Sequence, residues 1–165
     1  MIDFDQLYRG HAADLHRFVL HLSGDAVLAE DLVAETFIRV WTARDRVELA
    51  TVRGYLFAIA RNLFLKQLER RRREAPLEEA GEPSTPDDAA RFDAARELRE
   101  VLRDLQMLSE IDRTALLLRA EADLPYDEIA RILGISETAA KVKVHRARLR
   151  LVAARGRKSE ERGTP

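Results

Sequence analysis

The chain has 165 residues, with 28 Lys and Arg against 29 Asp and Glu, a formal net charge of −1 and no cysteine. The lack of cysteine excludes disulfides, Cys-based zinc sites and thiol catalysis. With 46% hydrophobic and 35% charged residues, the composition predicts packed cores and a soluble surface in one domain or two small ones. No apolar run reaches transmembrane length and the first residues do not resemble a signal peptide, so the sequence predicts an intracellular, cytoplasmic protein without direct membrane insertion.

Residues 4–44 predict two amphipathic helices, because apolar residues recur at helical spacing over residues 4–22 and again from Leu28 to Trp41. Three histidines in the first helix are five residues apart. They therefore point in different directions and predict no metal site. Along the second helix, Asp31, Glu35 and Arg39 form a polar stripe. The stripe fits either a solvated face with one favourable ion pair or a docking edge for a partner protein.

The middle of the chain combines a loop, a basic helix and an acidic linker. Residues 44–52 lack periodicity and predict the loop, whereas residues 53–73 predict a helix that ends in four consecutive arginines. These arginines have two possible roles. They are either cations that the helix dipole favours near a C-terminus or a patch that binds the phosphates of a nucleic acid. Residues 75–90 hold three prolines, one glycine and five acidic residues. Such a segment is too polar to be buried.

The remaining residues predict helices only. Residues 92–106 predict a charged helix, and Ser109 with Asp112 resembles a capping box that opens the next one. No strand pattern occurs. The sequence therefore predicts an all-α protein, with an N-terminal helical domain at residues 1–74, a linker at 75–95, a C-terminal domain at 96–155 and a mobile tail at 156–165.

Residues 124–151 carry the most specific pattern. Pro125 fits the first turn of a helix, Gly134 its C-terminal end, and Ser136 the cap of the following helix. Residues 138–158 contain eight Lys or Arg and no acidic residue. This arrangement is typical of a DNA-reading helix-turn-helix, although an ordinary helical hairpin with a solvated charged face shares the spacing. The inward face of the second helix is expected to hold Ala140, Val144, Ala147 and Leu151.

Three stretches together resemble the extracytoplasmic-function (ECF) sigma factors of bacterial RNA polymerase. They are residues 29–41, AEDLVAETFIRVW, residues 53–63, RGYLFAIARNL, and the helix-turn-helix at residues 124–151. Their order around an acidic Pro-containing linker is highly specific, and the likeness covers nearly the whole chain. The resemblance implies a subunit that docks on core polymerase and recognises the −10 and −35 promoter elements. A linker of about twenty residues spans at most roughly 70 Å, which would let the two domains occupy separate sites on one DNA without touching.

The resemblance also implies roles for individual residues. Docking on the β′ clamp coiled-coil would involve Asp31, Glu35, Ile38, Arg39 and Trp41. The −10 strand would be bound by Asp45, Arg46, Val47, Glu48, Leu49, Arg53, Tyr55, Arg61, Asn62 and Lys66. The −35 element would be read or clamped by Ser136, Thr138, Lys141, Val142, Lys143, His145, Arg146 and Arg148. The implied partners are core RNA polymerase, through its β′ and β subunits, promoter DNA and an anti-sigma factor. No cofactor, metal or small-molecule substrate is expected.

Four positions depart from the family pattern. Ala34 stands where Gln is usual, Ser109 where Pro is usual, and Ala140 and Val142 where Val and a small polar residue are common. The chain contains no Ser/His/Asp arrangement, HExxH motif or Gly-rich phosphate loop, so the sequence predicts a non-enzyme. Two alternatives remain open. One is a stand-alone helix-turn-helix regulator that binds duplex DNA without polymerase, and the other is a helical module that binds only protein.

Overall fold

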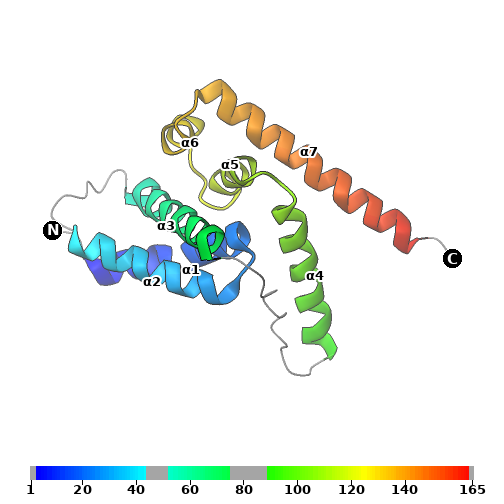
Figure 1. Cartoon of the computed structure of the whole chain (residues 1–165), viewed down its shortest axis with the longest axis horizontal. Helices are drawn as coiled ribbons and strands as arrows, with labels where there is room; N and C mark the ends of the chain where they lie inside the picture. The colour runs from blue at the N-terminus through cyan, green and yellow to red at the C-terminus, as the bar shows by residue number, and fades with distance from the viewer. Residues whose placement is uncertain (1–2, 44–51, 75–88, 164–165) are drawn as a thin grey trace.

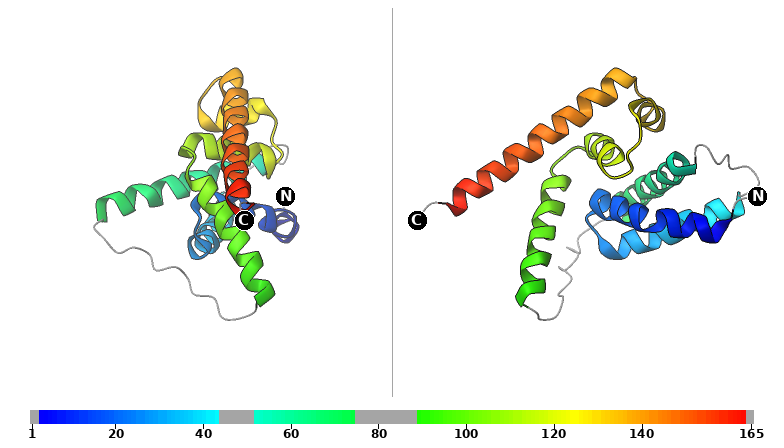
Figure 2. Two further views of the ribbon diagram at one scale, coloured as in Figure 1. Left: turned by 90° about the vertical axis from the view of Figure 1, so that its right-hand side faces the viewer. Right: turned by 180° about the vertical axis from the view of Figure 1, so that it is seen from behind.

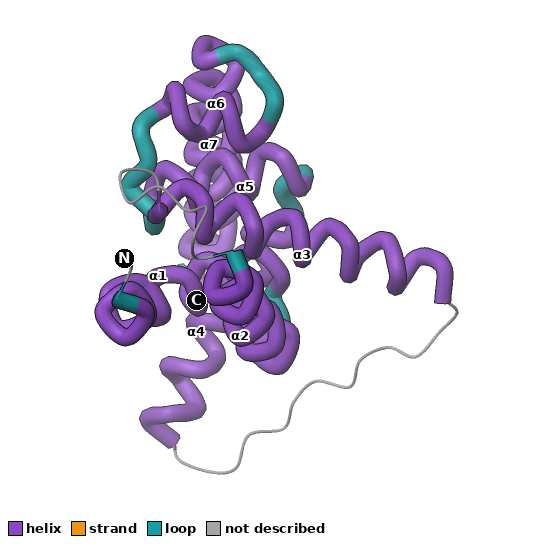
Figure 3. The backbone as a smooth tube through the Cα atoms, turned by 90° about the vertical axis from the view of Figure 1, so that its left-hand side faces the viewer, coloured by secondary structure: helices purple, strands orange, loops and turns teal. Residues whose placement is uncertain are grey.

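The computed structural model describes residues 3–43, 52–74 and 89–163, and every regular element within them is an α-helix (Figures 1 and 3). The predicted all-α class is confirmed. The helices are α1 (Phe4–Ser23), α2 (Ala26–Thr42), α3 (Val52–Glu74), α4 (Ala89–Gln106), α5 (Glu110–Ala120), α6 (Tyr126–Leu133) and α7 (Glu137–Arg162).

The first three helices form the N-terminal domain. Its centre is apolar, and Phe18 of α1 meets Phe57 of α3 edge to face with ring centroids 5.0 Å apart. Both rings are fully buried. α1 ends at Gly24, whose φ of 70° is the left-handed conformation that glycine adopts without strain. Asp25 then caps α2 by accepting a 3.0 Å hydrogen bond from the backbone N–H of Leu28.

The C-terminal domain is built around α5, which packs against α6 and α7. Leu118, Ile129 and Val144 are fully buried where these helices meet. Ser109 caps α5, as predicted, by accepting a 3.3 Å hydrogen bond from the N–H of Asp112. Pro125 differs slightly from the prediction. Its ψ of 155° is extended, so it is the N-cap of α6 rather than a member of the first turn.

Two helices extend beyond their predicted bounds. α4 begins at Ala89, three residues before the predicted start, and α7 continues through Arg162, where a mobile tail was expected after residue 155. The last turns of α7 are paired with α4, since Lys158 Nζ lies 2.6 Å from Asp104 Oδ1 and Arg162 Nη2 lies 2.6 Å from Glu100 Oε1. These ion pairs join the basic end of α7 to α4. In the view of Figure 1 the last turns of α7 lie to the right of α4.

The two domains are in contact, although the linker length alone would let them separate (Figure 2). α1 packs against α4 and α5, and α3 packs against α6. Gln106 of α4 donates Nε2 to the carbonyl oxygens of His21 and Leu22 at 3.3 Å each, which satisfies groups left open at the end of α1. His21 Nδ1 is also in hydrogen-bonding contact with the carboxylate of Glu121. The buried apolar residues of both domains therefore form a single cluster.

Candidate nucleic-acid interface

The turn between α6 and α7 has the geometry that the sequence predicted. Gly134 ends α6 with a φ of 66°, and the N–H of Ile135 donates to the Ala130 carbonyl at 3.0 Å. Ser136 then caps α7 by accepting a 3.0 Å hydrogen bond from the N–H of Ala139. The inward face of α7 is also as predicted, with Ala140, Val144 and Ala147 fully buried and Leu151 partly buried.

The outer face of α7 is open and basic. Nearly all of the predicted −35 residues on it are exposed, and Lys143 is partly buried. Lys141 lies over the ring of Tyr126 from α6, with Nζ 5.8 Å from the ring centroid. This face can therefore approach DNA without rearrangement of α6 or α7. The exposed members are Ser136, Thr138, Lys141, Val142, His145, Arg146 and Arg148.

The structure adds an acidic residue beneath this face. Asp112 of α5 is buried and accepts two hydrogen bonds from Arg146, from Nε at 3.1 Å and from Nη2 at 2.9 Å. Lys143 Nζ lies 3.7 Å from the same carboxylate. Burial raises the pKa of Asp112, but the hydrogen bonds and charge of Arg146, together with Lys143, outweigh burial and hold the pKa below its usual value. Asp112 in turn raises the pKa of Arg146.

From the sequence, Asp112 was expected only to take part in capping α5. Ser109 and Asp112 match a capping pattern, which is a local signal, whereas the Arg146 that binds the carboxylate lies 34 residues further along the chain. Asp112 lies in a charged first turn with Glu110 and Arg113, so the local sequence gives no sign of a partner on α7.

The predicted −10 residues of α3 lie on two faces of the helix. Tyr55, Asn62 and Lys66 line a hollow of about 640 Å³ between α2 and α3, together with Arg39. Asn62 and Lys66 follow Tyr55 by seven and eleven residues, spacings that return to the same side of a helix. The predicted loop residues Asp45, Arg46, Val47, Glu48 and Leu49 lie outside the described part of the chain.

Arg53 and Arg61 face the C-terminal domain instead of the hollow. Arg61 donates from Nε and Nη2 to the two carboxylate oxygens of Glu110, at 3.1 and 3.2 Å. Arg53 donates from Nε to the carbonyl of Ala122 at 2.6 Å and from Nη2 to Asp14 Oδ2 at 3.2 Å. The expectation that these arginines share a DNA-facing surface with Tyr55 therefore does not match their positions in this structure.

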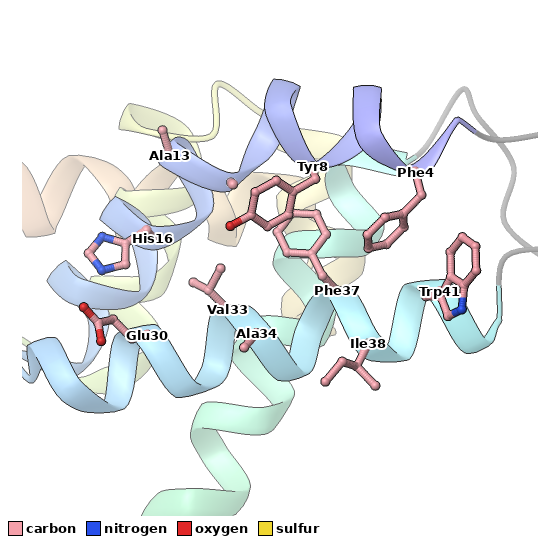
Figure 4. A pocket seen from close by; sticks show the side chains of 11 residues that line it. Phe4, Tyr8, Ala13, His16, Glu30, Val33, Ala34, Phe37, Ile38 and Trp41 are labelled. Atoms are coloured by element: carbon pink, nitrogen blue, oxygen red, sulfur yellow. The ribbon is translucent and has the colours of Figure 1, made fainter.

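The predicted docking residues on α2 are all exposed, namely Asp31, Glu35, Ile38, Arg39 and Trp41. The Glu35–Arg39 ion pair forms as predicted, at 3.1 Å. Ile38 and Trp41 also border an apolar groove of about 770 Å³ between α1 and α2 (Figure 4). Phe4 of α1 meets Trp41 edge to face at 5.0 Å. This groove was not predicted from the sequence, because it forms only where α1 and α2 lie side by side.

Within the described residues, no group of three or more His, Asp or Glu side chains is placed to hold a metal ion. None of the described helices is long and apolar enough to cross a membrane.

Comparison with known proteins identifies the family. Residues 7–74 match Sigma-70 region 2 and residues 98–151 match Sigma-70, region 4. The ECF RNA polymerase sigma factor SigM of Bacillus subtilis is 33% identical over 90% of this chain and 93% of that protein. The chain belongs to the ECF sigma factors. SigE of Mycolicibacterium smegmatis is 33% identical over an alignment that covers 92% of this sigma factor and 61% of SigE.

Solved structures agree with this family. The sigma factor RpoE from Bartonella quintana, in complex with the anti-sigma factor NepR, superimposes with a TM-score of 0.74 at 28% identity, covering 92% of this sigma factor and 96% of that chain. CnrH, in complex with the cytosolic domain of CnrY, gives a TM-score of 0.66 at 26% identity, covering 91% of this sigma factor and 85% of that chain.

The regions that match correspond to the two domains. The region 2 match runs through α1, α2 and α3, and the region 4 match includes the helix-turn-helix. A stand-alone regulator is therefore not favoured, because both sigma-70 regions are present in order. The C-terminal end of α7, residues 152–162, lies beyond the region 4 match and carries the ion pairs with α4.

Proposed function

We propose that this sigma factor divides promoter recognition between the outer face of α7, which enters the −35 major groove, and the hollow between α2 and α3, which holds the −10 strand. The main support for this proposal is the exposed basic face of α7. It lies on the second helix of a helix-turn-helix, the element that such motifs insert into the major groove. Its inward face is fully used in packing, so one orientation toward DNA is available.

On the −35 side, the exposed side chains divide by chemistry. Lys141 and Arg148 are cations suited to phosphates or guanine edges, and His145 offers a ring nitrogen. Val142, which is 54% exposed, cannot form a hydrogen bond and is suited to the methyl group of thymine. Thr138 and Ser136 lie at the N-terminus of α7, where the backbone favours a phosphate.

On the −10 side, we assign strand contact to the hollow lined by Tyr55, Asn62 and Lys66. An aromatic ring, an amide and a cation are the groups that stack on bases, bind base edges and neutralise phosphates. Arg53 and Arg61 would contact DNA only if they left their partners in the C-terminal domain. The loop residues 45–49 stay a prediction for a flipped base, whose unstacking costs a few kcal/mol.

For polymerase docking, we propose the exposed face of α2 that contains Glu35 and Ile38, with the adjoining apolar groove adding contact area. The relatives of known structure were solved with anti-sigma factors, RpoE with NepR and CnrH with CnrY. We infer that this protein has such a partner as well, and that it acts in the cytoplasm, where core polymerase is found.

Run-off transcription on genomic DNA with purified core polymerase tests the function. We expect discrete start sites that appear only when the sigma factor is added. Transcription that is unchanged by its addition would reject the proposal. Footprints made by the protein alone on duplex DNA, without polymerase, would instead support the stand-alone regulator.

A further inference from the structure

We propose that Asp112 is a positioning residue that orients the guanidinium of Arg146 so that its free edge recognises a guanine in the major groove. The proposal rests on the reading of the −35 element by α7. Asp112 lies on α5 and does not face DNA itself. It would nevertheless be one of the residues that determine which promoter sequence is recognised.

The contact joins a buried acid to a half-exposed cation. The side chain of Asp112 is 2% exposed, whereas that of Arg146 is 47% exposed. Asp112 is the third residue of α5, where the positive end of the helix dipole favours a carboxylate. A buried side chain on a packed helix has little freedom, so it can hold the orientation of a longer and more mobile side chain.

The atoms that take part decide which edge of Arg146 stays free. Asp112 accepts from Nε and Nη2, which lie along one side of the planar guanidinium. The other N–H of Nη2 and both N–H groups of Nη1 make no hydrogen bond among the described residues. These donors form the end of the fork, the edge that gives two parallel hydrogen bonds to O6 and N7 of guanine.

Fixing this edge has a thermodynamic advantage. An arginine that is free in solution loses side-chain entropy when it binds, and prior orientation removes part of that cost. Asp112 also balances the charge of Lys143, whose Nζ lies 3.7 Å from Oδ1, so two adjacent cations of α7 are held beside one carboxylate. Without Asp112 they would repel each other on the reading face.

The competing explanation is that the pair only ties α5 to α7. A purely structural tie predicts that its loss weakens binding to all DNA sequences together, or lowers stability alone. A positioning role predicts loss of preference at one base pair, with the preferences at other base pairs retained. The two explanations differ in a measurable quantity.

The test uses holoenzyme assembled from core RNA polymerase and the full chain. The DNA probe is a promoter found by run-off transcription, with its −35 region randomised. The wild type, Arg146→Ala, Asp112→Asn and Asp112→Glu each select from this library, and the selected sequences are counted. Thermal unfolding followed by circular dichroism reports whether each variant is folded. Asp112→Glu keeps the charge and provides a second variant if Asp112→Asn is unfolded.

We expect the wild type to prefer guanine by at least about fivefold at one position. Arg146→Ala and Asp112→Asn should both lose this preference and keep the others, and Asp112→Glu should retain part of it. Asp104→Asn is the matched control, because it removes another poorly exposed carboxylate that pairs with α7, 2.6 Å from Lys158. It should leave the guanine preference intact.

Three results would overturn the proposal. They are an unchanged preference in Arg146→Ala, an unchanged preference in Asp112→Asn, and an equal loss at all positions in Asp112→Asn. If the wild-type holoenzyme itself selected no sequence from the library, the reading of the −35 element by α7 would fail, and this inference would fail with it.

Discussion

Three residues in the first turn of α5, Glu110, Asp112 and Arg113, each bind a different part of the molecule. Glu110 holds Arg61 of α3, and Asp112 holds Arg146 of α7. Arg113 is buried, and its Nη1 donates to backbone carbonyls at and just beyond the end of α4. Burial lowers the pKa of Arg113, against the opposing effect of Glu110. One turn of helix therefore joins the N-terminal domain, α4 and α7.

The lowered pKa of Asp112 predicts how stability depends on pH. Folding favours the ionised form, so its stabilisation is complete above the unfolded pKa of about 4 and is lost as pH falls below that value. In denaturant unfolding followed by circular dichroism, the free energy of unfolding should fall less steeply below about pH 4 for Asp112→Asn than for the wild type. Arg146→Ala should also reduce the slope, because Arg146 lowers this pKa. Parallel curves for all three proteins would contradict the prediction.

Glu35→Arg tests the docking face at the level of one side chain. The substitution replaces an exposed acid with a cation in the Glu35–Arg39 pair, and we expect it to weaken co-elution with core polymerase by about tenfold or more if a basic partner surface is met there. The matched control is Glu69→Arg, since Glu69 forms a pair of the same type and spacing with Arg73 at 2.9 Å on α3. Equal co-elution of wild type and Glu35→Arg would reject this docking face.

The helices show how much local sequence can decide. Ser109 and Ser136 each cap the helix that the sequence predicted, because the oxygen of a short side chain satisfies a free N–H at a helix start. α7 shows the limit of this reasoning, since its last turns are helical where a tail was expected. Their partners, Asp104 and Glu100, come from a distant helix.

A pair of glycine substitutions tests the turn between α6 and α7. Gly134 and Gly10 both have open space around an added Cβ, but only Gly134 has a positive φ, of 66°. Gly134→Ala should lower the free energy of unfolding by about 1–2 kcal/mol because an L residue is strained there. Gly10→Ala, in the middle of α1, should raise it by up to about 1 kcal/mol. Calorimetry checks both, and an effect of the same sign at both positions would contradict the prediction.

At the scale of the molecule, the contact between domains uses the face of α3 that lies opposite the hollow between α2 and α3. Arg53 and Arg61 point to the C-terminal domain, while Tyr55, Asn62 and Lys66 line the hollow. Gly54 contributes as well, because a Cβ there would lie 3.0 Å from Glu128 Oε1 of α6. The domains can therefore stay in contact while the hollow remains accessible.

Arg61→Gln should loosen this contact. It removes two hydrogen bonds between side chains that are 12% and 26% exposed, and such a partly buried pair contributes about 1–3 kcal/mol. We expect a larger radius of gyration in X-ray scattering and faster hydrogen exchange in the first turn of α5. Arg73→Gln, which removes a well-exposed pair with Glu69, is the control and should change neither quantity. Unchanged scattering and exchange in Arg61→Gln would show that this pair does not hold the domains together.

The sequence by itself determined the helical class, the caps, the helix-turn-helix and the family, because each depends on residues within a few positions of one another or on motifs read in order. The tertiary structure decided which charged residues are free. Arg146 meets an acid 34 residues away and Arg61 one 49 residues away, and periodicity contains no information on such pairs. An arginine on a helix has the same local pattern whether it faces DNA or a buried carboxylate. Only the packing of α5 against its neighbours distinguishes the two, since it brings the carboxylate within hydrogen-bonding distance.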